Sequence, residues 1–78
     1  MISVHVRIAG ILRKPRGMSS LELALDDGAT AADIPAAAGY SEQERKSLRV
    51  RRGDEILNPA ERIGDGDELN IFAAIGGG

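Results

Sequence analysis

Hydrophobic and polar residues alternate with a period of two in the first part of the chain. Apolar side chains occupy every even position over residues 2–8 and every odd position over residues 21–25. Successive side chains of a strand point to opposite faces, so this period is typical of strands that bury one face. We therefore predict a hairpin with strands at 2–8 and 21–25, joined by a long, mobile, basic loop over residues 10–20.

One helix is predicted in the middle of the chain. The alanine-rich stretch over residues 31–38 suits a helix that packs closely on a sheet, and Gly39 is a natural stop at its C-terminal end. Thr30 stands three residues before Asp33, an approximate capping arrangement. A helix that started at Thr30 would place Pro35 at its fifth position, where the ring crowds the carbonyl of an earlier turn. The helix therefore begins nearer Asp33, or its first turn is distorted.

The second half of the chain alternates in the same way. A polar, helix-compatible stretch covers residues 41–46. Three predicted strands follow it, at 48–51, 56–57 and 69–73. The first two of these strands form a second hairpin, and an acidic glycine turn precedes the last strand. The order strand, strand, helix, strand, short strand, strand lets the first and last strands lie side by side in the middle of a mixed sheet. The pattern therefore predicts an α+β fold.

Composition narrows the function classes. The 78 residues make one domain, and their formal net charge of −2 argues against a nucleic-acid binder, which is usually basic. The absence of cysteine excludes disulfides and thiol catalysis, and a single histidine leaves no recognisable zinc pattern, so no metal is expected. No apolar run approaches the roughly 18 residues of a membrane span, and the N-terminus lacks a signal-peptide profile. We expect a soluble, cytoplasmic protein that is monomeric when free.

A glycine run follows the last predicted strand. Glycine lacks a Cβ, so it can thread a narrow channel of another protein and present a terminal carboxylate there. We therefore expect a single domain over residues 1–75 and a flexible, reactive tail over residues 76–78. In this tail Gly78 would carry the reactive carboxylate, and Gly76 and Gly77 would provide clearance and reach. The alternative is a frayed glycine-rich end without a role, because chain ends are often poorly ordered.

Three stretches, in this order and at this chain length, resemble the sulfur carriers ThiS and MoaD. They are Gly-Ala-Thr-Ala-Ala-Asp-Ile at 28–34, Gly-Asp-Gly-Asp-Glu-Leu at 64–69, and the ending Gly77-Gly78. The ending is the specific match, whereas a capped helix and an acidic glycine turn occur in many folds. The resemblance covers nearly the whole chain. It implies the ubiquitin-like β-grasp fold, a mixed sheet with one main helix packed on one face.

The resemblance also implies a carrier and not an enzyme. A ubiquitin-activating-enzyme-like adenylyltransferase would adenylate Gly78 with ATP, a sulfur donor enzyme would convert the adenylate to a thiocarboxylate, and a synthase subunit would accept the sulfur. The chain has no P-loop and no GxGxxG sequence, so we expect no cofactor on it and assign the ATP chemistry to the partner. The long loop over residues 10–20 is more similar to MoaD than to ThiS, which favours molybdopterin over thiamin thiazole formation.

Strand parity predicts the face that the activating partner recognises. When the apolar positions face the core, the following side chains face outward on neighbouring strands: Arg7, Arg49, Arg51 and Phe72. We predict that Phe72 is the anchor of this face, flanked by these arginines and by His5, and assign Ile75 to the same face. The alternative is that Phe72 belongs to the core. His5 has no predicted nucleophile beside it and is expected to be a solvated surface residue.

Three other function classes stay open or are disfavoured. The basic residues over 45–52 suggest a small nucleic-acid-binding module, but the net negative charge and the scarcity of aromatic side chains argue against it. A ubiquitin-like modifier would use the same adenylate of Gly78, which a lysine of a target protein would attack in place of sulfide. A noncovalent β-grasp binding module with an idle tail is the third class.

Overall fold

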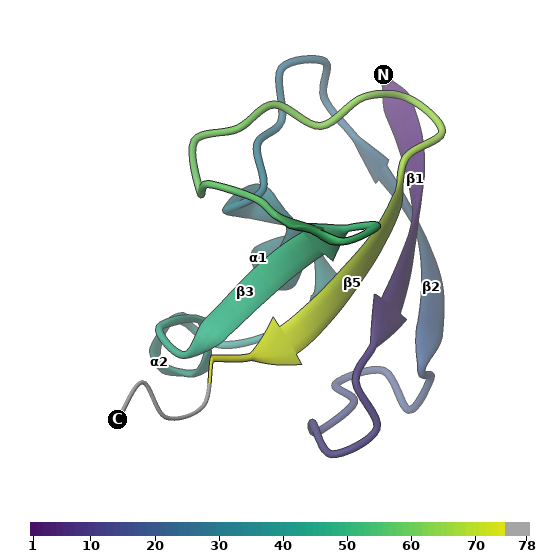
Figure 1. The fold of residues 1–78 in the computed structure, drawn as a ribbon. Coiled ribbons are helices and arrows are strands. Elements are labelled where there is room, and N and C mark those ends of the chain that lie inside the picture. Colours follow the sequence, from purple (N-terminus) through teal and green to yellow (C-terminus); the bar gives the residue numbers. More distant parts are fainter. Residues whose placement is uncertain (75–78) are drawn as a thin grey trace.

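Five strands form one mixed sheet in the computed structural model, which describes residues 1–74 (Figure 1). The elements, in chain order, are β1 (Ile2–Ile8), β2 (Ser20–Leu25), α1 (Asp33–Ala38), α2 (Glu42–Arg45), β3 (Leu48–Arg52), β4 (Glu55–Ile56) and β5 (Glu68–Ala73). The strands lie in the order β2-β1-β5-β3-β4. Only β1 and β5 run parallel among these neighbours. The predicted α+β fold and the central position of the first and last strands are therefore confirmed.

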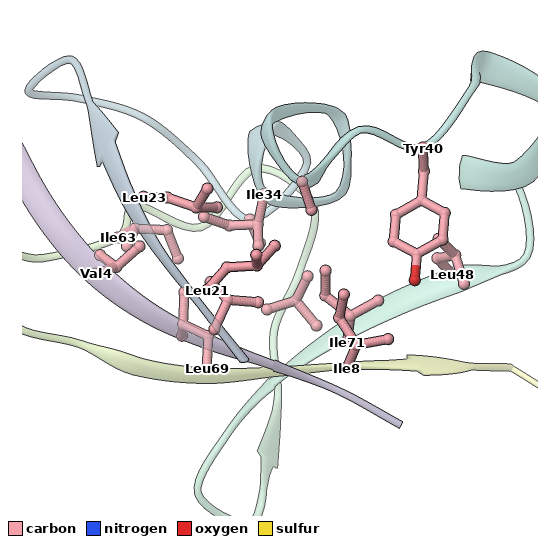
Figure 2. Close-up of a cluster of buried hydrophobic side chains, with 14 of the residues drawn as sticks. Val4, Ile8, Leu21, Leu23, Ile34, Tyr40, Leu48, Ile63, Leu69 and Ile71 are labelled. Carbon is pink, nitrogen blue, oxygen red and sulfur yellow. The ribbon is translucent and has the colours of Figure 1, made fainter. Parts of the chain in front are cut away.

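The core lies between the sheet and α1 (Figure 2). Val4 and Val6 of β1 and Leu69 and Ile71 of β5 are at most 1% exposed, and Ile34 of α1 is fully buried. These strand residues are the ones that the alternating pattern assigned to the core. The side chains between them therefore face away from α1, on the opposite face of the sheet.

Helix α1 begins at Asp33, and this start accommodates Pro35. Proline then occupies the third helical position, where its missing N–H would have had no acceptor within the helix. Thr30 is not the cap of the helix; its backbone N–H instead donates to Asp33 Oδ2 over 2.9 Å. Gly39 ends the helix with φ 105°. No helix among residues 1–74 is long and apolar enough to cross a membrane.

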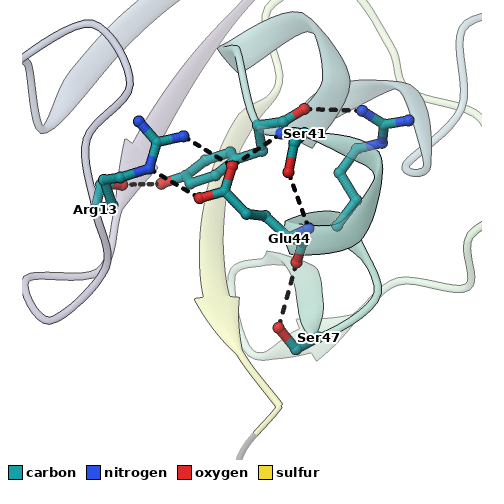
Figure 3. Close-up of polar contacts among 6 residues, drawn as sticks. Arg13, Ser41, Glu44 and Ser47 are labelled. Carbon is teal, nitrogen blue, oxygen red and sulfur yellow. Dashed lines mark hydrogen bonds and ion pairs between the residues drawn. The ribbon is translucent and has the colours of Figure 1, made fainter.

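The connection between β1 and β2 is fastened to the helical side of the molecule. Arg13 forms a bidentate ion pair with Glu44 of α2, with N–O distances of 2.8 and 2.7 Å (Figure 3). The Tyr40 hydroxyl donates to the carbonyl of Arg13, and Arg16 Nη2 donates to the carbonyl of Ala37 over 2.9 Å. The predicted long loop is present, but these contacts hold it against α1 and α2, and a freely mobile loop would lack them.

The second hairpin differs in detail from its prediction. Its short strand is Glu55–Ile56 and not residues 56 and 57. Leu57 turns inward and is 3% exposed, whereas Ile56 stays on the surface with 60% of its area exposed. Gly53 makes the turn with φ 60°, a backbone conformation that residues with a Cβ atom rarely adopt. The strand β4 is therefore too short to cover the full length of β3.

Candidate functional site

The outer face of the sheet, opposite α1, gathers the side chains that strand parity assigned to it. Arg49 lies directly across from Phe72, and Arg51 across from Asn70, between β3 and β5. Arg7 of β1 lies beside Asn70 on the other side of β5. The structure therefore brings the predicted arginines together around Phe72 and Asn70, and we call this group the Phe72 face.

Phe72 is half-buried and not a core residue. Its ring lies under the guanidinium of Arg51, whose Cζ is 5.9 Å from the ring centroid, within the range of a cation–π contact. Arg49 shares the register position of Phe72, but its Nη1 donates to the carbonyl of Leu48 over 2.9 Å. Arg51 is therefore the arginine that covers the ring, and the Arg49 guanidinium turns toward the edge of β3.

Sequence reasoning missed Ile56 as a member of the same face. Ile56 pairs with Arg51 between β4 and β3, so the two side chains point to the same side of the sheet. With 60% of its area exposed, it is one of the most exposed large apolar side chains of residues 1–74. The parity rule would have found it if the short strand had been placed at 55–56. Ile56 extends the Phe72 face to the edge of the sheet.

His5 lies on the outer face but away from Phe72, so the prediction that it flanks Phe72 is wrong. It pairs with Glu22 of β2 and with Glu68 of β5. Its Nδ1 is 2.8 Å from Glu22 Oε1 and its Nε2 is 2.8 Å from Ser20 Oγ. A hydroxyl therefore does lie beside His5, contrary to the sequence prediction. Both ring nitrogens are satisfied by neighbouring strand residues on the open sheet, which is a cross-strand polar contact.

The arginines of the Phe72 face differ from Arg52, on the opposite side of β3, in their ion pairs. Arg7, Arg49 and Arg51 make no ion pair within residues 1–74. Arg52, the next residue along β3, pairs with three carboxylates, those of Glu55, Glu61 and Asp67, at 3.9, 3.1 and 3.1 Å. The hydrogen bond to Asp67 raises the pKa of Arg52. Three arginines without an ion pair therefore lie on the Phe72 face.

The end of β5 places the chain beside this face. Ala74, just after β5, donates its N–H to the carbonyl of Ser47 over 2.8 Å, at the start of β3. The predicted reactive tail, Gly76, Gly77 and Gly78, and the predicted contact residue Ile75 lie outside the described residues. The Phe72 face therefore adjoins the point at which the chain continues toward the glycines.

Comparison with known proteins places the chain in a family. A profile of the ThiS family matches residues 6–78. A search among curated proteins gave no match.

Several solved structures have a similar fold. SAMP1 from Haloferax volcanii is 23% identical, with a TM-score of 0.71 over 97% of this chain and 99% of that chain. A candidate molybdopterin converting factor, subunit 1, from Pyrococcus furiosus is 17% identical, with a TM-score of 0.76 over 96% of this chain and 100% of that chain. Ubiquitin from Caldiarchaeum subterraneum is 20% identical, with a TM-score of 0.65 over 99% of this chain and 98% of that chain. At these identities the structures establish the ubiquitin-like β-grasp fold.

Proposed function

The chain belongs to the ThiS family, and on this premise we propose that it is a sulfur carrier whose Gly78 carboxylate is activated by a partner enzyme. The observation that carries this proposal is the reach of the family match, which runs through the glycines to residue 78. The protein supplies the carboxyl group and the docking surface, and its partners supply the catalysis.

The chemistry needs activation because a carboxylate is a poor electrophile. An oxygen of the Gly78 carboxylate attacks the α-phosphate of ATP on an adenylyltransferase, and pyrophosphate leaves. A sulfur donor enzyme then delivers sulfide to the acyl carbon, AMP leaves, and a thiocarboxylate remains on Gly78. A synthase subunit finally transfers this sulfur to a cofactor precursor. Gly76 and Gly77 allow the chain to enter the partner's active site because they carry no side chains.

The Phe72 face is the surface that we propose for the adenylyltransferase. A half-buried aromatic ring supplies apolar contact area at small entropic cost, and Arg7, Arg49 and Arg51 attract carboxylates of the partner. The face adjoins the end of β5, so a partner that binds it has the reactive end of the chain within reach.

Molybdopterin formation is the pathway that we favour over thiazole formation. The connection between β1 and β2 spans residues 9–19, an extended hairpin loop of the kind that resembles MoaD. The similarity of the fold to a candidate molybdopterin converting factor subunit supports the same choice.

A protein modifier is the second candidate function. The structural similarity to SAMP1, which is also described as small archaeal modifier protein 1, favours it. The adenylate of Gly78 is common to both functions. In the modifier a lysine amine of a target protein attacks the acyl carbon, AMP leaves, and an isopeptide bond forms.

Intact-mass analysis of a chain that ends at Gly78, purified from its source, tests these proposals. A sulfur carrier gains the mass difference between one sulfur and one oxygen atom, whereas a modifier yields lysine-linked conjugates of higher mass. A variant with one alanine added after Gly78 should lose both products, because its carboxylate lies beyond the attack position. The matched control carries the alanine before Met1. Normal sulfuration of the variant extended at Gly78 would show that the terminal mechanism is wrong.

A further inference from the structure

A groove opens along the edge of β3 where β4 does not cover the strand. Its volume is about 190 Å³, and its walls are mainly apolar, formed by Ala31, Pro35, Leu48, Val50 and Leu57. An engineered apolar cavity of roughly 150 Å³ accommodates benzene, so the groove has room for one aromatic ring or one branched aliphatic side chain. It lies on the helical side of the sheet, opposite the Phe72 face.

The backbone of β3 is available for hydrogen bonding beside this groove. Ala74 donates to Ser47, so Arg49 and Arg51 are the residues of β3 that exchange hydrogen bonds with β5. The alternation directs the backbone groups of Leu48 and Val50 to the other edge. Both carbonyls at this edge are engaged, because Val50 accepts from the Leu57 N–H and Leu48 accepts from Arg49 Nη1, each over 2.9 Å. Outside the strand ladders, the N–H groups of Leu48 and Val50 make no backbone hydrogen bond within residues 1–74. The carbonyl groups of an extended segment can therefore accept from these two N–H groups at the edge of β3.

Two guanidiniums border the groove and carry uncompensated charge. Arg45 Nη1 donates to the carbonyl of Tyr40 over 2.8 Å, and Arg49 Nη1 donates to the carbonyl of Leu48 over 2.9 Å. Neither arginine makes an ion pair within the described part of the chain. Glu44, the half-buried carboxylate of α2, is engaged by Arg13. The rim of the groove is therefore complementary to acidic side chains.

We propose that this groove binds an extended, acidic segment of a partner protein. The segment adds to the edge of β3, places one large apolar side chain between α1 and β3, and directs carboxylates toward Arg45 and Arg49. The site lies on the other side of β3 from the Phe72 face and does not include the glycine tail. Arg49 also belongs to the Phe72 face, so the segment and a partner on that face share this residue.

Titration of the ¹⁵N-labelled protein with synthetic peptides tests the proposal. The probes are capped peptides with the core Val-X-Val, where X is Leu, Ile or Phe, flanked on each side by two aspartates. We expect at least one of them to shift the amide signals of Leu48, Val50 and Leu57 more than those of Arg7 and Asn70. The matched control peptides carry lysine in place of aspartate and should bind at least about tenfold more weakly, a difference of about 1.4 kcal/mol.

Variants of the protein sharpen the test. The double change Arg45→Gln and Arg49→Gln should weaken binding of the best peptide about tenfold, whereas Arg51→Gln, two positions further along β3 and over the ring of Phe72, should leave it unchanged. Ala32→Glu at the exposed rim should also weaken binding, because the added carboxylate repels the aspartates of the peptide. Ala32→Gln should not, because glutamine has a similar size and no charge.

Several outcomes would overturn the proposal. It is wrong if none of the three acidic peptides binds at millimolar concentration, if lysine and aspartate peptides bind equally, or if the shifts centre on Arg51 and Asn70. Signals of Leu48 and Val50 that move with protein concentration alone would assign the groove to a second copy of the chain. These experiments need no adenylyltransferase, so their result is independent of the proposed sulfur-carrier function.

Discussion

Arg51 and Arg52 are consecutive residues of β3 with opposite surroundings. Arg51 covers the ring of Phe72 and makes no ion pair within residues 1–74, whereas Arg52 is surrounded by the carboxylates of Glu55, Glu61 and Asp67. Neighbouring strand residues point to opposite faces of a sheet, so a shift of one position along β3 moves an arginine from the ring of Phe72 to the carboxylates on the other face. The ion pairs of Arg52 hold the segment after β4 against the sheet. The guanidinium of Arg51 has no carboxylate partner within residues 1–74, so its charge is available to a partner protein.

The largest effect on the outer face is expected for Phe72→Ala. Loss of the ring should weaken binding to the adenylyltransferase by at least about 1 kcal/mol, roughly fivefold, which is typical of a useful anchor. The free energy of unfolding should change little because the ring is half-buried and outside the core. A binding titration beside thermal denaturation measures both quantities, with Asn70→Ala as the matched outward control on β5. A loss of roughly 3–5 kcal/mol of stability would instead mark Phe72 as a core residue.

An effect of comparable size, on stability and on the other side of β3, is expected for Asp67→Ala. The Asp67 carboxylate accepts from Gly64 N over 2.8 Å and from Arg52 Nη1 over 3.1 Å. Its removal should lower the free energy of unfolding by about 1–2 kcal/mol, because both donors lose their acceptor. Asp67→Asn keeps an oxygen for Gly64 and should cost less. If denaturant unfolding finds Asp67→Ala no less stable than Arg51→Ala, the contrast between the two sides of β3 is wrong.

Arg51→Gln should act on the rate of association. Removal of one uncompensated charge should slow binding to the adenylyltransferase severalfold and reduce its dependence on salt, since steering is electrostatic and screened by ions. Stopped-flow measurements at low and high ionic strength detect the change. Arg52→Gln is the matched control and should destabilise the fold without altering the salt dependence. Equal salt dependence for the wild type and Arg51→Gln would contradict the assignment of Arg51.

The smallest effect concerns a second compensated arginine, Arg13. Its hydrogen bonds to Glu44, with that from the Ser41 backbone, lower the pKa of Glu44 from 4.5 to about 2. The folded state thus binds the Glu44 proton more weakly than the unfolded state, so this contribution to stability is complete above pH 4.5. It is lost as the pH falls from 4.5 toward 2. Denaturant unfolding from pH 6 to pH 2 should therefore show that the difference in stability between the wild type and Glu44→Gln shrinks over this window, and a constant difference would contradict the pairing.

Several features of the fold follow from local sequence. The strand at 2–8, the strand predicted at 48–51, which extends to Arg52 in the structure, and the identity of their buried faces follow from a period of two, which needs no information about distant residues. Gly39 stops α1 because its φ of 105° suits glycine, and a Cβ there would also lie 3.0 Å from Pro15 Cβ. The outward direction of Phe72 was predictable for the same local reason.

Tertiary structure decided the surroundings of these residues. The sequence did not show that Arg51, and not Arg49, covers Phe72, that Ile56 extends the same face, or that Ser20 lies beside His5. It also predicted a mobile loop where Arg13 is fastened to Glu44, 31 positions away. Such contacts join segments that only the sheet order and register bring together. The alternating sequence therefore determined which side chains leave the core, and the folded chain determined which charges find a partner and which stay available.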